Sequence, residues 1–295
     1  MAQPRSVIVT GGASGLGKIM SAHFASLGDT VTIFDVNAVD GAARAAELDD
    51  AQKVALQQQT VGRTGRAGGV RFEKCDVSSW DEQKRAFKAV FEAVGRIDVV
   101  VANAGVAEGG RSWIVPPMGD EGDEELERDP ALKVLDINLN GVVYSVKLAQ
   151  HYMRRNAPDP ATGSRGSIIC TASNVGLYPF PPAPLYTASK HAVVGLVRSL
   201  GPVYGRPHIG IRINALAPAV LATNIAGTDA LFSKMIITPP STLIEGVEKL
   251  LNDAEMNGQV LEIHGLNVTV RPPHDVVDAD SRHNLDEFVN FGYGQ

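Results

Sequence analysis

The chain has 295 residues, of which 44% are hydrophobic and 20% are charged. This is an ordinary globular composition, and the length is enough for one large α/β domain. The formal net charge of −6 gives no reason to expect a nucleic-acid partner or an anionic membrane surface. No apolar run is long enough to span a bilayer, and no charged-then-apolar leader begins the sequence, so we expect a cytoplasmic protein.

The cysteines and histidines do not form a metal-binding pattern. The two cysteines, Cys75 and Cys170, lie inside apolar runs far apart in the sequence, and the seven histidines are scattered without an HExxH pair. We therefore predict no metal site and interpret both cysteines as small core residues.

A strand, a glycine turn and a helix open the chain. Residues 6–10 form an apolar run, residues 11–17 read Gly-Gly-Ala-Ser-Gly-Leu-Gly, and a helical pattern follows up to Gly28. Glycines let backbone N–H groups approach a phosphate closely, and a helix N-terminus favours negative charge. This arrangement predicts a site for a dinucleotide pyrophosphate. Its predicted components are Gly11, Ser14, Gly15, Leu16 and Gly17.

Asp35 stands at the end of the second predicted strand, residues 30–34, and Val36 follows it. A carboxylate in this place can bind the 2′-hydroxyl of an adenosine ribose and repels a 2′-phosphate. No Arg or Lys stands in the glycine turn or directly after Asp35, so the sequence favours NAD over NADP. The simpler alternative is that Asp35 only caps the next helix, predicted over 38–59.

Two further strand ends complete the predicted cofactor site. The third strand covers residues 70–75 and ends where an adenine ring could rest. The fourth covers 97–102 and leads into small residues that the ribose and nicotinamide could pass closely. The residues predicted at these two ends are Asp76, Val77, Asn103, Ala104 and Gly105.

Strands and helices alternate along the chain, which predicts a single doubly wound parallel sheet of the Rossmann type, with about seven strands and helices on both faces. The later elements are expected as helices over 81–94, 131–155, 185–204 and 241–251 and strands over 166–170, 209–216 and 258–263. We assign residues 1–265 to this domain and 266–295 to a polar C-terminal tail. Ligands of such sheets bind at the carboxyl ends of the strands, where the predicted site residues fall.

A phenol, an ammonium and a hydroxyl come together near the fifth strand. Tyr186 and Lys190 lie four residues apart in a predicted helix and so share one face, and Ser173 follows the strand. A tyrosine titrates near ~10, and a nearby cation lowers that pKa, so Tyr186 is a candidate acid or base toward an alcohol or carbonyl oxygen. A Tyr-x-x-x-Lys pair also occurs by chance in many helices, so the hypothesis depends on the other motifs.

With these residues in order, the chain resembles the short-chain dehydrogenase/reductase family over roughly residues 6–265. Within that family it looks like the NAD-dependent 15-hydroxyprostaglandin dehydrogenases and their fungal relatives. The residues that carry the resemblance are Thr10 to Gly17, Asp35, Asp76, Val77, Asn103 to Gly105, Asn138, Ser173, Tyr186 and Lys190.

The resemblance implies a role for each matching residue. Tyr186 is the acid/base, Lys190 lowers its pKa and holds the nicotinamide ribose, and Ser173 orients the substrate oxygen. Asn138 kinks its helix and holds a water that links Lys190 to solvent. The cofactor positions after the sixth strand are Pro218, Val220 and Thr223, the last two at the carboxamide of the nicotinamide.

The chain departs from its relatives at three places. Pro218-Ala219 stands where the family usually has Pro-Gly. Ala183 stands where the prostaglandin enzymes have Gln, and the segment after Thr223 is shorter than theirs, and these two differences argue against prostaglandin itself. Rigid and apolar residues predict a pocket wall for a bulky hydrophobic alcohol, such as a polyketide, a terpenoid or a fatty-acid derivative. The predicted substrate-binding residues are Ser173, Val175, Tyr178, Phe180, Ala183 and, from an irregular insert over 106–130, Trp113.

Taken together, these features predict an NAD-dependent dehydrogenase that oxidises a secondary alcohol to a ketone. The resemblance also implies a homodimer or homotetramer, paired through the long helices expected over 131–155 and 185–204. Two alternatives stay open. The same fold could serve an NAD(P)H-dependent ketoreductase on a similar substrate, or a non-catalytic dinucleotide sensor. The intact set of Asn138, Ser173, Tyr186 and Lys190 argues against a sensor, which has no need of all four.

Overall fold

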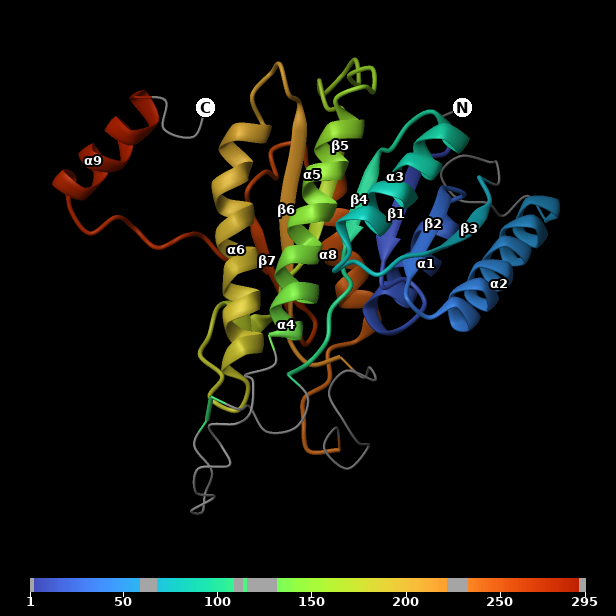
Figure 1. The fold of residues 1–295 in the computed structure, drawn as a ribbon, viewed down its shortest axis with the longest axis horizontal. Coiled ribbons are helices and arrows are strands. Elements are labelled where there is room, and N and C mark those ends of the chain that lie inside the picture. The colour runs from blue at the N-terminus through green and yellow to red at the C-terminus, as the bar shows by residue number, and fades with distance from the viewer. Residues whose placement is uncertain (1–2, 59–67, 109–113, 116–131, 222–232, 292–295) are drawn as a thin grey trace.

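In the described part of the chain, one sheet of eight strands organises the protein (Figure 1). The computed structural model describes residues 3–58, 68–108, 114–115, 132–221 and 233–291. The strands are β1 (Ser6–Thr10), β2 (Thr30–Asp35), β3 (Val70–Lys74), β4 (Val99–Ala102), β5 (Gly166–Thr171), β6 (Ile211–Pro218), β7 (Val260–His264) and β8 (Asn267–Val270). They lie in the order β3-β2-β1-β4-β5-β6-β7-β8, and all pairs except β7·β8 are parallel. The order reverses between β1 and β4, the point where ligands bind in doubly wound sheets.

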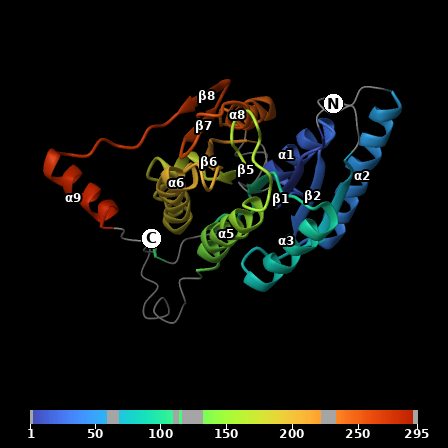
Figure 2. The same ribbon diagram turned by 90° about the horizontal axis from the view of Figure 1, so that it is seen from above.

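Helices cover both faces of this sheet (Figure 2). The helices on one face are α3 (Trp80–Val94), α5 (Gly141–Met153) and α6 (Pro184–Tyr204), and those on the other are α1 (Gly15–Ser26), α2 (Ala38–Gln57) and α8 (Pro240–Asn252). Two buried clusters fill the spaces between sheet and helices, one around Phe87 and Val193 and the other around Phe24 and Val247. Because both faces are covered, the central strands are continuous apolar runs. The predicted α/β fold is confirmed.

The sheet continues past residue 265, where we placed the start of the tail. β8 pairs antiparallel with β7, and Gly265 takes a φ of 51° in the turn between them, a conformation that glycine adopts readily. This eighth strand was not expected, because it has only four residues and its side chains are exposed or half-buried. Beyond it, α9 (Ala279–Asn290) lies apart from the sheet in both views and has no buried residue.

The long helix expected over 131–155 is interrupted at Asn138. A short helix, α4 (Lys133–Leu135), leads into a π-helical turn over Asp136–Asn140 before α5 begins. Such turns are rare and often occur at functional sites. Asn138 is 0% exposed, so its amide needs partners inside the protein.

Candidate active site

The turn between β1 and α1 has no room for a side chain at Gly11 or Gly17. A Cβ added to Gly17 would lie 2.1 Å from the carbonyl oxygen of Gly11, and one added to Gly11 would lie 2.9 Å from Ala104 Cα. Ser14, the N-cap of α1, makes no side-chain cap hydrogen bond. The first N–H groups of the helix are therefore left to another acceptor, and the turn fits the expected pyrophosphate.

Asp35 borders this turn from the end of β2. Its Oδ2 accepts a hydrogen bond from the Ala13 N–H at 3.1 Å, and its Oδ1 accepts one from the Asn37 N–H at 3.0 Å. The N-cap of α2 is Asn37, whose side chain accepts from the Asp40 N–H, so the alternative that Asp35 caps this helix is wrong. A carboxylate beside the phosphate turn fits a ribose diol, and Val36 stands exposed next to it.

Asp76 and Val77 lie at the end of β3, but their side chains have other partners. Asp76 Oδ1 accepts from the N–H and the hydroxyl of Ser78, at 2.9 and 2.7 Å. Val77 is buried and packs on Gly141, where an added Cβ would lie 2.9 Å from its Cγ2. An adenine contact at this strand end stays a prediction.

Hydrogen bonds tie the ends of β1, β4 and β5 together. Thr10 Oγ1 accepts from the N–H groups of Asn103 and Ala104, both at 2.9 Å. Asn103 Nδ2 donates to the Thr10 carbonyl at 3.0 Å, and the Thr171 hydroxyl donates to Asn103 Oδ1 at 3.1 Å. We had assigned no role to Thr171. The available signal was a hydroxyl residue at the last position of an apolar strand.

Ser173, Tyr186 and Lys190 meet at this same edge. The Lys190 Nζ lies 5.7 Å from the centroid of the Tyr186 ring and donates to the Thr171 carbonyl at 2.8 Å. The Ser173 side chain lies close enough to the phenol of Tyr186 to act on its pKa in the lowering direction. It also lies near Pro218, whose carbonyl accepts from Ser173 Oγ at 3.4 Å. The fold thus brings together the three groups whose chemistry we paired from the sequence.

Burial opposes the charged forms of the phenol and the ammonium. It raises the pKa of Tyr186 above its usual value, although the nearby Ser173 hydroxyl acts in the lowering direction. Burial also lowers the pKa of Lys190 to about 8. The loss of solvent thus dominates the pKa of Tyr186 in this structure, and the lowering expected from Lys190 stays a prediction. At neutral pH the site holds a protonated phenol beside an ammonium.

Asn138 braces the site from the π-helical turn. Its Oδ1 accepts from the Val106 N–H at 2.8 Å, and its Nδ2 donates to the Val106 carbonyl at 2.9 Å and to Ser189 Oγ at 3.2 Å. A Cβ added to Gly105 would lie 3.2 Å from Asn138 Oδ1 and 3.5 Å from Lys190 Nζ, so both side chains converge on this glycine. The expected water relay stays a prediction, because the side-chain amide is engaged with protein groups.

The expected pocket wall is only partly in place. Tyr178 donates its hydroxyl to Glu262 at 2.9 Å and accepts from Arg271 at 2.8 Å, so its polar end joins the segment after β8. Phe180 is 43% exposed. Gly15, Leu16, Val175, Ala183 and Val220 also lie in the described ranges, and their roles stay predictions. Trp113 and Thr223 lie outside the described residues.

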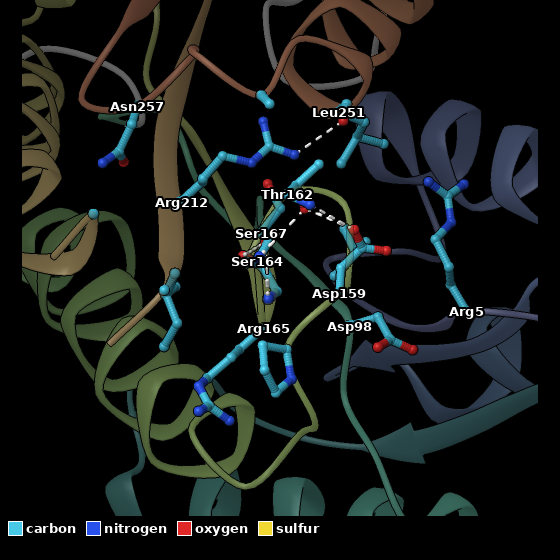
Figure 3. Close-up of a pocket in the computed structure, with 18 of the residues that line it drawn as sticks. Arg5, Asp98, Asp159, Thr162, Ser164, Arg165, Ser167, Arg212, Leu251 and Asn257 are labelled. Carbon is cyan, nitrogen blue, oxygen red and sulfur yellow. Dashed lines mark hydrogen bonds between the residues drawn. The ribbon is translucent and has the colours of Figure 1, made fainter. Parts of the chain in front are cut away.

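A hollow of about 1000 Å³ lies at the opposite edge of the sheet (Figure 3). Residues at the amino ends of the strands line it, and no residue of the predicted tetrad is among them. Its charged groups pair with near neighbours: Arg5 with Asp29 and Arg96 with Asp98, while Arg212 donates to carbonyls at the end of α8. The chemistry predicted from the sequence therefore lies at the other edge.

Metal and thiol chemistry find no support in the described ranges. No group of three His, Cys, Asp or Glu residues there could hold a metal ion. Burial raises the pKa of both Cys75 and Cys170 to about 12, which makes them inert thiols. No helix in the same ranges has the length and apolar character needed to cross a membrane.

Comparisons with known proteins agree with this geometry. A family model described as short chain dehydrogenase matches residues 5–231. The short-chain dehydrogenase/reductase prx4 of Penicillium roqueforti is 32% identical over 97% of this chain and 74% of its own length. A 3beta-hydroxysteroid dehydrogenase of Mediterraneibacter gnavus is 34% identical over 72% of this chain and 64% of its own. A solved short-chain type dehydrogenase/reductase from Mycobacterium ulcerans has a TM-score of 0.69 at 26% identity, with 90% of each chain covered.

Proposed function

We propose that this chain, which belongs to the short-chain dehydrogenase family and is therefore an oxidoreductase of hydroxyl or keto groups, oxidises a secondary alcohol to a ketone with NAD. The observation that carries the proposal is the meeting of Ser173, Tyr186 and Lys190 at the carboxyl edge of the sheet, beside the glycine turn. The narrower resemblance to 15-hydroxyprostaglandin dehydrogenases stays a prediction.

The residues of the cluster divide the work of proton transfer. Tyr186 first loses its own proton to solvent, and its phenolate Oη then takes the hydroxyl proton of the alcohol, while Ser173 holds the same alcohol oxygen by a hydrogen bond. Lys190 places a positive charge next to the ring, which stabilises the phenolate that acts as the base. A bound oxidised nicotinamide would supply the hydride acceptor and a further positive charge. Asn138 holds the loop after β4 in position through Val106.

The choice of NAD rests on Asp35. Its carboxylate lies against the phosphate turn through the Ala13 N–H, so a 2′-phosphate bound there would meet a negative charge at close range. We infer that NADH binds more tightly than NADPH. Equal or tighter binding of NADPH would show that Asp35 does not select the cofactor.

A bulky hydrophobic alcohol is the substrate class that the surroundings favour. The segment that leads into α6 carries Tyr178 and Phe180, both partly exposed, and prolines that stiffen it. A relative named for a 3beta-hydroxysteroid supports a large, rigid, secondary alcohol. Polyketide, terpenoid and fatty-acid-derived alcohols all meet this description.

One observation favours the reverse reaction as a second candidate. Burial raises the pKa of Tyr186, so the phenol is protonated at neutral pH and can give its proton to a carbonyl oxygen. A ketoreductase would use the same residues with the proton moving the other way.

The proposal is tested by NADH formation, read by its fluorescence, over a panel of apolar secondary alcohols, with NADH consumption over the matching ketones. We expect turnover in both directions, faster with bulky alcohols than with sugars. Tight NAD binding without turnover on either panel would favour a sensor and contradict the enzyme. The cytoplasmic location and a homodimer or homotetramer paired through α5 and α6 stay predictions.

A further inference from the structure

Glu108 reaches the active site from the loop after β4. Its Oε2 accepts a hydrogen bond from the backbone N–H of Tyr186 at 3.0 Å. Tyr186 is the third residue of α6, and the N-cap of that helix is Ala183, which has no side-chain acceptor. Glu108 therefore performs the capping role from a distant part of the chain, where the helix dipole also favours its negative charge.

The second oxygen of the Glu108 carboxylate, Oε1, is unusual because it is buried without a hydrogen-bond partner among the described residues. Buried acceptors are nearly always paired, and an unpaired carboxylate oxygen is among the most unfavourable groups to bury. A donor from outside the described protein would satisfy it.

This oxygen differs in its position from the other buried polar atoms that lack a hydrogen-bond partner in the described ranges. Those atoms are Ser6 Oγ, Arg44 Nε, Asn156 Oδ1, Ser167 Oγ and Arg198 Nε. Ser6 and Ser167 lie near the amino ends of their strands, and Arg44 and Arg198 lie on helices. Glu108 alone in this set is a carboxylate, and it alone contacts a residue of the catalytic cluster.

The loop that carries Glu108 is held against that cluster. Val106, two residues earlier, exchanges two hydrogen bonds with Asn138, and Gly105 lies next to both Asn138 and Lys190. A fixed loop gives the carboxylate a fixed place at the first turn of α6, the turn that carries Tyr186, and fixed placement is what a specificity-determining group needs.

We propose that Glu108 Oε1 accepts a hydrogen bond from a second hydroxyl of the substrate, so that the preferred alcohol is an apolar diol or polyol. This inference rests on the proposed function and names its substrate class more closely. A carboxylate acceptor rewards a hydroxyl donor and repels a substrate that carries its own carboxylate in the same place. Discrimination of this kind is strong, because a substrate without the donor leaves the buried acceptor unpaired.

The test compares kcat/KM for 1-indanol, cis- and trans-1,2-indanediol, 1,3-indanediol and 1-hydroxyindane carboxylate. The variants are Glu108→Gln, Glu108→Ala, and Glu108→Ala combined with Ala183→Ser, which restores a local cap for α6. Ala183→Ser alone measures the effect of that change by itself. Glu255→Ala, an exposed glutamate at the amino edge, is the matched control.

We expect the wild type and Glu255→Ala to prefer at least one diol over 1-indanol by about tenfold or more and to reject the carboxylate. Glu108→Ala should lower the Tm, and the added Ala183→Ser should recover it without recovering the diol preference. Glu108→Gln should lose the preference mainly through KM. If the double variant Glu108→Ala/Ala183→Ser regains its Tm and still prefers the diol, the inference is wrong while the proposed function stands. The same holds if the wild type oxidises 1-indanol at the same kcat/KM as every diol. A wild type that acts on no alcohol or ketone overturns both.

Discussion

The two edges of the sheet carry charged groups in opposite ways. At the amino edge, Asp29 is 0% exposed and receives three hydrogen bonds from Arg5, while Asp98 accepts from Arg96 and from the Ser6 N–H. These ions are paired with partners that hold the strand ends. At the carboxyl edge, Lys190 is equally buried, but its ammonium meets a backbone carbonyl and an aromatic ring and has no carboxylate partner in the described ranges.

The difference shows what each edge is for. The charges at the amino edge are satisfied by one another and need no ligand, so we interpret that edge as stabilising the fold. The carboxyl edge keeps a buried ammonium, a half-buried tyrosine and an unpaired carboxylate oxygen in one place. Groups with pKa values shifted by burial cluster at functional sites, where poor pairing is tolerated because ligands complete the contacts.

The largest effect should come from Tyr186→Phe at the carboxyl edge. Removing the phenolic oxygen removes the acid/base, so kcat should fall about a thousandfold, while the Kd for NAD should stay within a few-fold. Steady-state kinetics and NAD titration measure the two. Tyr144→Phe, whose ring packs against Trp80, is the control and should change neither. Comparable turnover in Tyr186→Phe would remove the role assigned to this residue.

Asp29→Ala tests the amino edge. It leaves the Arg5 guanidinium partly buried without its main partner, so the free energy of unfolding should fall by about 3–5 kcal/mol. Chemical denaturation measures the loss. At temperatures where the variant is folded, its KM for NAD should match the wild type. A variant of normal stability with impaired catalysis would contradict the division between the edges.

Lys190→Met should make the protein more stable at neutral pH although it damages the enzyme. The folded-state pKa of about 8 lies below the ordinary 10.5, so the unfolded chain binds the proton more tightly. Below about pH 8, the buried charge of Lys190 lowers the free energy of unfolding by its full amount. Between about pH 8 and 10.5 this destabilisation is progressively lost, so the free energy of unfolding rises with pH. Removing it should raise the free energy of unfolding at pH 7 by ~3 kcal/mol.

This effect is measured by denaturation of both proteins at pH 7 and at pH 10, since the difference between them isolates the lysine. The gain should shrink at the higher pH. If Lys190→Met is less stable than the wild type at pH 7, the buried ammonium stabilises the fold through its contacts, as the ion pairs of the amino edge do, and the prediction is wrong.

The smallest of these effects is expected from Gly17→Ala in the phosphate turn. Its Cβ would lie 2.1 Å from the Gly11 carbonyl oxygen, so the backbone must move and the Kd for NAD should rise about a hundredfold. Gly195→Ala, on an exposed part of α6 with open space around its Cβ, is the control and should bind NAD normally. Unchanged NAD affinity in Gly17→Ala would place the cofactor elsewhere.

Local pattern was enough to predict much of this fold and site. Apolar runs bounded by glycine predicted the seven parallel strands, and the four-residue spacing of Tyr186 and Lys190 predicted their contact. Both signals lie within a few residues, where period and helix geometry determine the outcome.

Long-range contacts and burial were beyond such patterns. The cap that Glu108 provides for α6 and the contact of Tyr178 with Arg271 join residues that no local spacing relates. The raised pKa of Tyr186 was missed for the same reason, since the sequence shows the neighbouring cation but not the loss of water around both groups. Desolvation depends on how the whole domain packs.

A structure of the ternary complex with NAD and an unreactive analogue of the substrate alcohol tests the central claim most directly. We expect the analogue oxygen within about 2.6–3.2 Å of both Tyr186 Oη and Ser173 Oγ, at the carboxyl edge. An analogue bound in the amino-edge hollow instead, or a Tyr186 phenol turned away from the analogue oxygen, would contradict the account.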